Sequence, residues 1–239
     1  NEALKFSPKD NGTIKNIKSY LLKSHYELGN KKNFISCLID LINLGEKNSM
    51  IGSFCSKGNI KFNIDIKNPF CNLPLNYVYH ESLKNNCDFE EIFRKPIIKF
   101  LDHRKISNKE QKLLSNGYQT SGNIFLNNNN IFIEVKKIIE AELKKYIQKF
   151  KNSNEGFIHN WPSSYTLYGW LVSYENNGLI LPHIHERGLV SGSVYINVPK
   201  KMNKHDGGLF LNLTDDIYTK NYNFKSSQLM DVETASICL

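Results

Sequence analysis

Apolar residues recur at helical intervals through the first 50 residues of the chain. In TIKNIKSYLLKSHYELGN they lie near helical spacing, and Gly29 follows as a residue type that commonly ends a helix. NFISCLIDLINLG repeats the pattern and closes at Gly45. The spacing predicts antiparallel helices over residues 1–50.

The pattern changes after residue 50. GNIKFNIDIKNPFCNLPLNYV alternates apolar and polar residues, and Pro69 and Pro74 forbid a continuous helix. We interpret the change as a domain boundary. The chain then divides into a helical segment at residues 1–50 and a second domain at residues 51–239.

Two further helices are expected in the second domain, followed by strands. The helices are FEEIFRKPIIKFLDH and IFIEVKKIIEAELKKYIQKF, the latter with one apolar face. The expected strands are YTLYGWLVSYENNG, which ends in a turn, then ILPHIHERG, LVSGSVYINVP, GGLFLNLT and VETASICL. Helices followed by antiparallel strands predict an α+β fold. The strand spacing fits a double-stranded β-helix, or jelly-roll, backed by helices.

Composition narrows the possible partners. The formal net charge is +8, but the lysines are scattered rather than gathered in a basic stripe, which argues against a nucleic-acid partner. No apolar run approaches the ~20 residues of a membrane helix, so we expect no membrane partner. The five cysteines form no CxxC pair, which indicates reduced thiols and a cytoplasmic protein.

The candidate chemistry lies in LPHIHERGLVSGSVYINVP, where His183 and His185 stand one residue apart. In a strand, residues i and i+2 project to the same face, so both imidazoles would aim at one point while Ile184 and Glu186 face away. Imidazole nitrogen is a ligand for Zn, Fe, Ni and Cu. The pattern therefore predicts a metal site, with two surface histidines of no function as the alternative.

The order HIH, SGSVYINVP and GGLFL resembles the iron(II)/2-oxoglutarate oxygenases over about residues 160–211. It is most similar to a subfamily of these oxygenases that often follows tetratricopeptide repeats. The helical segment at residues 1–50 itself resembles such repeats. That segment is either a scaffold for a protein partner or a helical cap for the next domain.

The resemblance implies a role for each matching residue. His183 matches the first Fe(II) ligand, and His185 stands where the family usually has a carboxylate. Tyr174 and Tyr195 match tyrosines that line the 2-oxoglutarate site, although both could instead be core aromatics. No catalytic residue beyond the metal ligands is implied. The implied reaction hydroxylates an unidentified substrate with O₂ and releases succinate and CO₂.

Two departures from the family pattern affect the metal site. Histidine in place of the carboxylate leaves neutral ligands, so the dianionic cosubstrate must supply compensating charge. The chain also stops inside an apolar strand, and we expect the distal histidine and the 2-oxoglutarate arginine beyond Leu239. The polypeptide as given is then expected to be inactive. Glu186 and His205 are the substitutes for a third ligand within the chain.

Two other functions compete with the oxygenase interpretation. Cupins share the barrel and an HxH motif, but they carry a glutamate where this chain has Leu189 and Val190. The second alternative is a non-catalytic interaction module, in which the helical repeats recruit a partner and the barrel holds no metal. A histidine and an arginine soon after Leu239 would favour the oxygenase.

Overall fold

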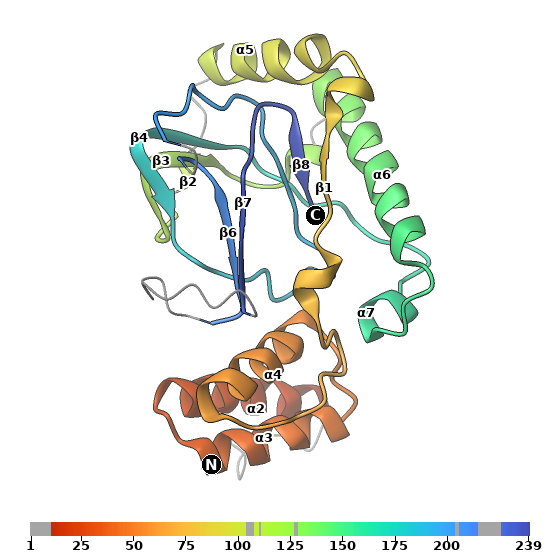
Figure 1. The fold of residues 1–239 in the computed structure, drawn as a ribbon, viewed down its shortest axis with the longest axis vertical. Helices are drawn as coiled ribbons and strands as arrows, with labels where there is room; N and C mark the ends of the chain where they lie inside the picture. The colour runs from red at the N-terminus through yellow and green to blue at the C-terminus, as the bar shows by residue number, and fades with distance from the viewer. Residues whose placement is uncertain (1–10, 104–107, 110, 127–128, 204–205, 215–225) are drawn as a thin grey trace.

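The structure is a computed structural model that describes residues 11–103, 108–109, 111–126, 129–203, 206–214 and 226–239. A helical unit lies at one end of the molecule, and small antiparallel sheets with flanking helices lie at the other (Figure 1). The α-helices are α2 (Asn11–Glu27), α3 (Lys31–Asn43), α4 (Ser49–Phe62), α5 (Lys95–His103), α6 (Asn130–Phe150) and α7 (Gly156–His159). Shorter helical turns are η1 (Pro74–Tyr77), η2 (Leu83–Asn85), η3 (Glu90–Arg94) and η4 (Ile124–Leu126).

Helices α2, α3 and α4 form a unit with its own apolar core. The side chain of Phe34 is fully buried there, and its ring lies 5.7 Å from Tyr26 and 5.1 Å from Phe62, centroid to centroid. The other fully buried residues of this core are Leu22, Leu38, Leu41, Ile51 and Cys55. The predicted helix ends are confirmed, because Gly29 and Gly45 adopt the left-handed φ values 67° and 84° between the helices.

The sequence predicted that the helical pattern ends after residue 50. This prediction is wrong at its start, because Ser49–Phe62 forms helix α4. Its glycines allow close packing rather than strand formation. A Cβ atom at Gly58 would lie 2.4 Å from the Phe34 ring, and one at Gly52 would lie 2.8 Å from Phe70 Cβ. Tertiary contacts thus outweigh the local pattern, and the helical unit extends beyond the predicted limit at residue 50.

Helix α6 confirms the predicted long helix and covers one face of a sheet that contains the carboxyl-terminal strand (Figure 1). Its residues Val135, Leu143 and Tyr146 share a buried cluster with Ala235 and Ile237. The same face buries a carboxylate, Glu142, which is satisfied by polar neighbours. Its donors are Tyr79 Oη at 2.9 Å, Asn86 Nδ2 at 3.0 Å and Lys145 Nζ at 2.7 Å.

Eight strands form antiparallel sheets in the described residues. They are β1 (His80–Ser82), β2 (Asn108–Lys109), β3 (Leu114–Thr120), β4 (Val172–Ile180), β5 (Ser193–Val194), β6 (Leu209–Asn212), β7 (Ser227–Met230) and β8 (Ser236–Cys238). The strand orders are β1-β8-β5, β2-β3-β4 and β6-β7. All pairings are antiparallel, as the α+β prediction requires.

The predicted strands differ from the observed ones in extent. The expected turn at ENNG lies inside β4, where the register with β3 shifts and Asn177 has a φ of 59°. ILPHIHERG is not a strand: β4 ends at Ile180, and residues 181–192 have no regular structure. β5 keeps only two residues of LVSGSVYINVP. Sheet pairing with distant segments, which sequence alone does not reveal, sets these limits.

Within the ranges described above, no helix is both long enough and apolar enough to cross a bilayer.

The helical unit gives a test of its core. We expect Phe34→Ala to lower the free energy of unfolding by about 3–5 kcal/mol, because the cavity lies among fully buried side chains. Ile39→Ala, on the same helix but 43% exposed, should cost less than about 1 kcal/mol. Urea denaturation of the two variants measures both values. Equal losses would contradict the assignment of Phe34 to this core.

Candidate metal site

The segment with both histidines follows directly from β4. Its first residue, Leu181, donates its backbone N–H to Leu113 O at 2.8 Å, which ties the segment to the chain just before β3. His183 and His185 follow outside any strand. The alternation that predicted their common direction is therefore absent.

The two imidazoles nevertheless lie side by side. Their ring centroids are 5.1 Å apart and their planes are inclined by 58°. Both residues are exposed, although Trp170 covers part of the His185 ring, so the pair remains accessible to an ion from solvent. Packing outside the strands thus brings the rings of His183 and His185 together.

Each imidazole is oriented through its Nδ1 atom. The His183 Nδ1–H donates to Leu181 O at 2.8 Å, because a carbonyl oxygen can only accept. His185 Nδ1 lies 2.9 Å from the Ser191 hydroxyl, which can act as donor or acceptor. Metal-binding histidines are commonly fixed in this way through the nitrogen that does not bind the ion. In the described part of the chain, no hydrogen bond engages either Nε2 atom.

Trp170 packs against the second histidine. Its ring meets the His185 ring edge to face at 5.1 Å, and Tyr168 packs on Trp170 at 5.9 Å. Burial lowers the pKa of His185, and the neighbouring His183 lowers it further. The imidazole of His185 is therefore held in its neutral, metal-binding form to lower pH than an ordinary histidine.

The two predicted cosubstrate tyrosines lie near one another. Tyr195 follows β5 and packs with Met230 and Cys238 in a small apolar cluster. Burial raises the pKa of Tyr195, with smaller contributions from Cys238 and from Tyr174. Tyr174, on β4, is 50% exposed, and burial of its ring raises its pKa too. Among the described contacts, neither hydroxyl forms a hydrogen bond with the histidines.

Within the residues that it describes, the structure identifies no third ligand. Among the residues it describes, no group of three His, Cys, Asp or Glu side chains is placed to hold an ion. Glu186 is exposed, and its carboxylate lies 3.9 Å from Lys23 Nζ of α2. His205, the other predicted substitute, lies outside the described residues.

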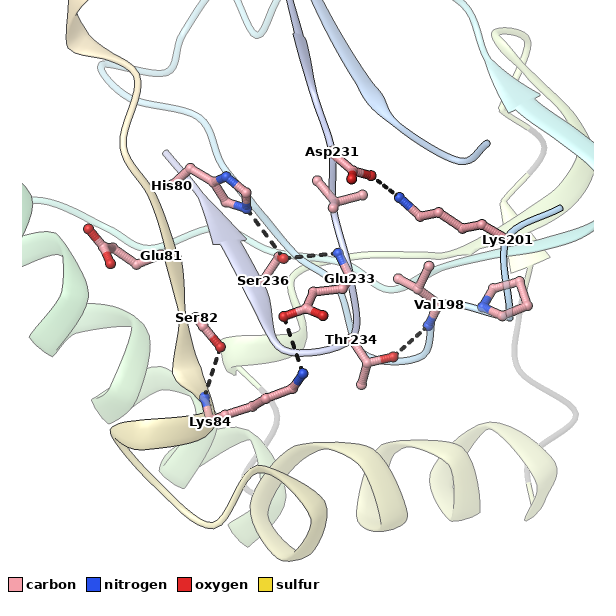
Figure 2. Close-up of a pocket in the computed structure, with 12 residues that line it drawn as sticks. His80, Glu81, Ser82, Lys84, Val198, Lys201, Asp231, Glu233, Thr234 and Ser236 are labelled. Carbon is pink, nitrogen blue, oxygen red and sulfur yellow. Dashed lines mark hydrogen bonds and ion pairs between the residues drawn. The ribbon is translucent and has the colours of Figure 1, made fainter. Parts of the chain in front are cut away.

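A separate groove of about 620 Å³ runs beside β1 and β8 (Figure 2). Two ion pairs lie along it: Lys84 Nζ lies 3.2 Å from Glu233, and Lys201 is paired with Asp231. None of the residues predicted for the metal or cosubstrate site lines this groove. It therefore adds nothing to the histidine pair.

Sequence reasoning missed the residues that orient His185. Ser191 belongs to the Ser-Gly pair that follows the histidines, so its position near the motif was a usable signal. Trp170 lies in a segment predicted as a strand, and no pattern indicated its contact with an imidazole.

Comparisons with models of protein families, with curated proteins and with solved structures returned no match.

The contact between Trp170 and His185 can be tested by measuring the pKa of His185. His185 should titrate below the ordinary histidine pKa of about 6.5, and Trp170→Ala should move its pKa upward by removing burial. NMR titration of the ring Cε1–H signal measures both values. A His185 pKa at or above 6.5, or one unaffected by Trp170→Ala, would contradict the described packing.

The lowered pKa of His185 also predicts how the stability of the protein changes with pH. Between the lowered folded-state pKa and about 6.5, the unfolded chain binds more protons at His185 than the folded protein does. The free energy of unfolding should thus fall as the pH drops through 6.5, and this contribution is fully lost below the folded-state pKa. His185→Gln should remove that part of the pH dependence in urea denaturation.

Proposed function

We propose that this chain carries an iron(II)/2-oxoglutarate-dependent oxygenase domain, with His183 and His185 as two of its metal ligands. The observation that supports it most strongly is the pair of imidazoles, with centroids 5.1 Å apart and each Nδ1 atom held by a neighbour. Two imidazoles, each oriented through its Nδ1 atom, suit a divalent transition metal.

The proposed fold of the oxygenase domain is a double-stranded β-helix. The three antiparallel sheets are taken as parts of that core, with α5 and α6 as the backing helices. The unit of α2, α3 and α4 is taken as tetratricopeptide-like. This arrangement is supported by the helical unit preceding the sheets and by the position of the histidine pair directly after β4.

The third ligand is proposed to lie on residues that continue β8. Cys238 pairs with Ser193 of β5 in an antiparallel register, so the chain after Cys238 runs back toward Ser191. The Ser191 hydroxyl contacts His185. A side chain two or three residues further along this strand would approach the imidazoles.

The cosubstrate provides the charge that the ligands lack. Bound 2-oxoglutarate and Fe(II) would supply activation of O₂ and hydroxylation of the substrate, with release of succinate and CO₂. Tyr195 is proposed to donate a hydrogen bond to a carboxylate of 2-oxoglutarate. Burial keeps its phenol protonated, which preserves it as a donor beside an anion. Tyr174 is proposed to line the same site.

The metal ligands can be tested by direct binding. We expect His183→Ala and His185→Ala each to weaken Co(II) binding more than tenfold, because each removes one imidazole from the ion. The matched control is His159→Ala at the exposed end of α7, which should leave binding unchanged. Titration followed by Co(II) absorbance measures the affinities.

Turnover separates the oxygenase from the interaction module. A protein extended by the residues that continue β8 should convert 2-oxoglutarate to succinate with added Fe(II), and His183→Ala should abolish this conversion. Equal succinate formation by the extended protein and its His183→Ala variant would contradict the assignment. Absence of metal binding by the extended protein would favour the non-catalytic module.

Tyr195 gives a further prediction on the metal-loaded, extended protein. Tyr195→Phe should weaken 2-oxoglutarate binding roughly tenfold, the scale of one hydrogen bond to a charged group at about 1.5–3 kcal/mol. Tyr20→Phe, on the exposed surface of α2, is the matched control. An unchanged affinity for Tyr195→Phe would show that Tyr195 serves only in packing.

A further inference from the structure

The metal-site segment turns sharply immediately after His185. The Gly188 N–H donates to His185 O at 2.8 Å, which closes a tight turn over residues 185–188. This turn fixes where the backbone of His185 points. Whatever holds the turn therefore also influences the position of the His185 imidazole.

The helical unit contacts this turn through one hydroxyl. Ser49 Oγ lies 2.9 Å from Glu186 O and 3.4 Å from His185 O. A hydroxyl has a single proton, so the shorter contact is the principal hydrogen bond. It joins residues 137 positions apart in the chain and satisfies a carbonyl that the turn itself leaves unpaired.

Ser49 is well placed to hold the turn because its helix is itself anchored. It is the first residue of α4, whose start is capped by the Asn48 side chain accepting from Ile51 N at 3.0 Å. Three residues further along, Gly52 packs under Phe70, and its carbonyl accepts from the buried Asn68 Nδ2 at 2.8 Å. The first turn of α4 is thus fixed to the following segment of the chain.

A second contact joins the same two parts of the molecule. Lys23 of α2 lies 3.9 Å from the Glu186 carboxylate, and the two side chains are 60% and 51% exposed. Exposed pairs at this distance contribute little to stability. The Ser49 hydrogen bond is therefore the stronger candidate for a link between the helical unit and the turn.

We propose that Ser49 is a positioning residue through which the helical unit holds His185 in place for metal binding. Ser49 bonds the backbone of the turn, while Ser191 and Trp170 contact the His185 ring. The proposal rests on the proposed function, because it concerns the same metal site. It assigns the helical unit a role in that site in addition to any partner binding.

This role has a thermodynamic consequence. If the helical unit improves the geometry of the site, metal binding must in turn stabilise the docked helical unit by the same factor. A partner that binds α2, α3 and α4 can then change metal affinity without touching the histidines. The Ser49 hydrogen bond is the physical route for that coupling.

The test compares Ser49→Ala with Ser49→Thr, which keeps the hydroxyl, and with Ser24→Ala. Ser24 is an exposed serine of α2 whose hydroxyl bonds only Tyr20 O in the described contacts. Three readouts are used at a temperature where every variant is folded. They are Co(II) affinity, hydrogen exchange of the Gly188 amide, and the shift that the Trp170 ring imposes on the His185 ring protons.

We expect Ser49→Ala to weaken Co(II) binding about tenfold, as removal of a supporting contact commonly does. It should also speed exchange at Gly188 and reduce the Trp170-induced shift, whereas Ser49→Thr and Ser24→Ala should resemble the parent. Faster exchange with unchanged Co(II) affinity would overturn the proposal, because Ser49 would then serve stability alone. Unchanged values in all three readouts would overturn it as well.

Failure of the proposed function gives a different result. If the parent protein, extended along β8, binds no Co(II), the metal assignment fails for every variant alike. The exchange and ring-shift measurements in the metal-free protein then still decide whether Ser49 positions His185. A ring shift that is lost in Ser49→Ala and restored in Ser49→Thr supports the positioning role, and an unchanged shift contradicts it.

Discussion

The segment that carries both histidines runs outside the strands, so a few separate hydrogen bonds hold its backbone in place of a strand ladder. Leu181 donates to the chain before β3, Gly188 donates within the turn, and Ser49 donates from α4. Each bond fixes one point of residues 181–188. The position of the imidazoles is therefore a property of tertiary structure rather than of a strand.

This dependence explains how the pair can lie close together while remaining accessible. In a strand, alternation would direct both side chains to one face, and the backbone would be hydrogen-bonded to neighbouring strands of a sheet. Here the rings of His183 and His185 are held through their Nδ1 atoms, and their other edges face away from those contacts. The arrangement leaves two imidazole rings side by side and open to solvent.

The sequence predicted the helices well where local spacing decides them. The segments ending at Gly29 and Gly45 and the long helix α6 follow from apolar periodicity. It failed at α4, where Gly52 and Gly58 serve close packing against Phe70 and Phe34. Those aromatic partners lie elsewhere in the chain, and no local pattern contains that information.

The sequence predicted that the two imidazoles lie close together, but not the backbone geometry that brings them together. The rings of the HxH motif are neighbours, although the strand alternation behind that expectation is absent. The contacts from Ser49 and Trp170 depend on chain segments that meet only on folding. The short extent of β5 has the same origin, since its pairing partner β8 lies more than 40 residues away.

The most direct test of the account is a Zn(II) titration of protein carrying ¹⁵N-labelled histidine, extended along β8 and observed by NMR. Zinc is a diamagnetic probe that binds the same imidazole nitrogens as Fe(II). The account predicts that the Nε2 signals of His183 and His185 shift together and are complete at one equivalent, while the other histidines stay unchanged. A shift at one of the two alone, or at all histidines in proportion, would contradict a shared metal site.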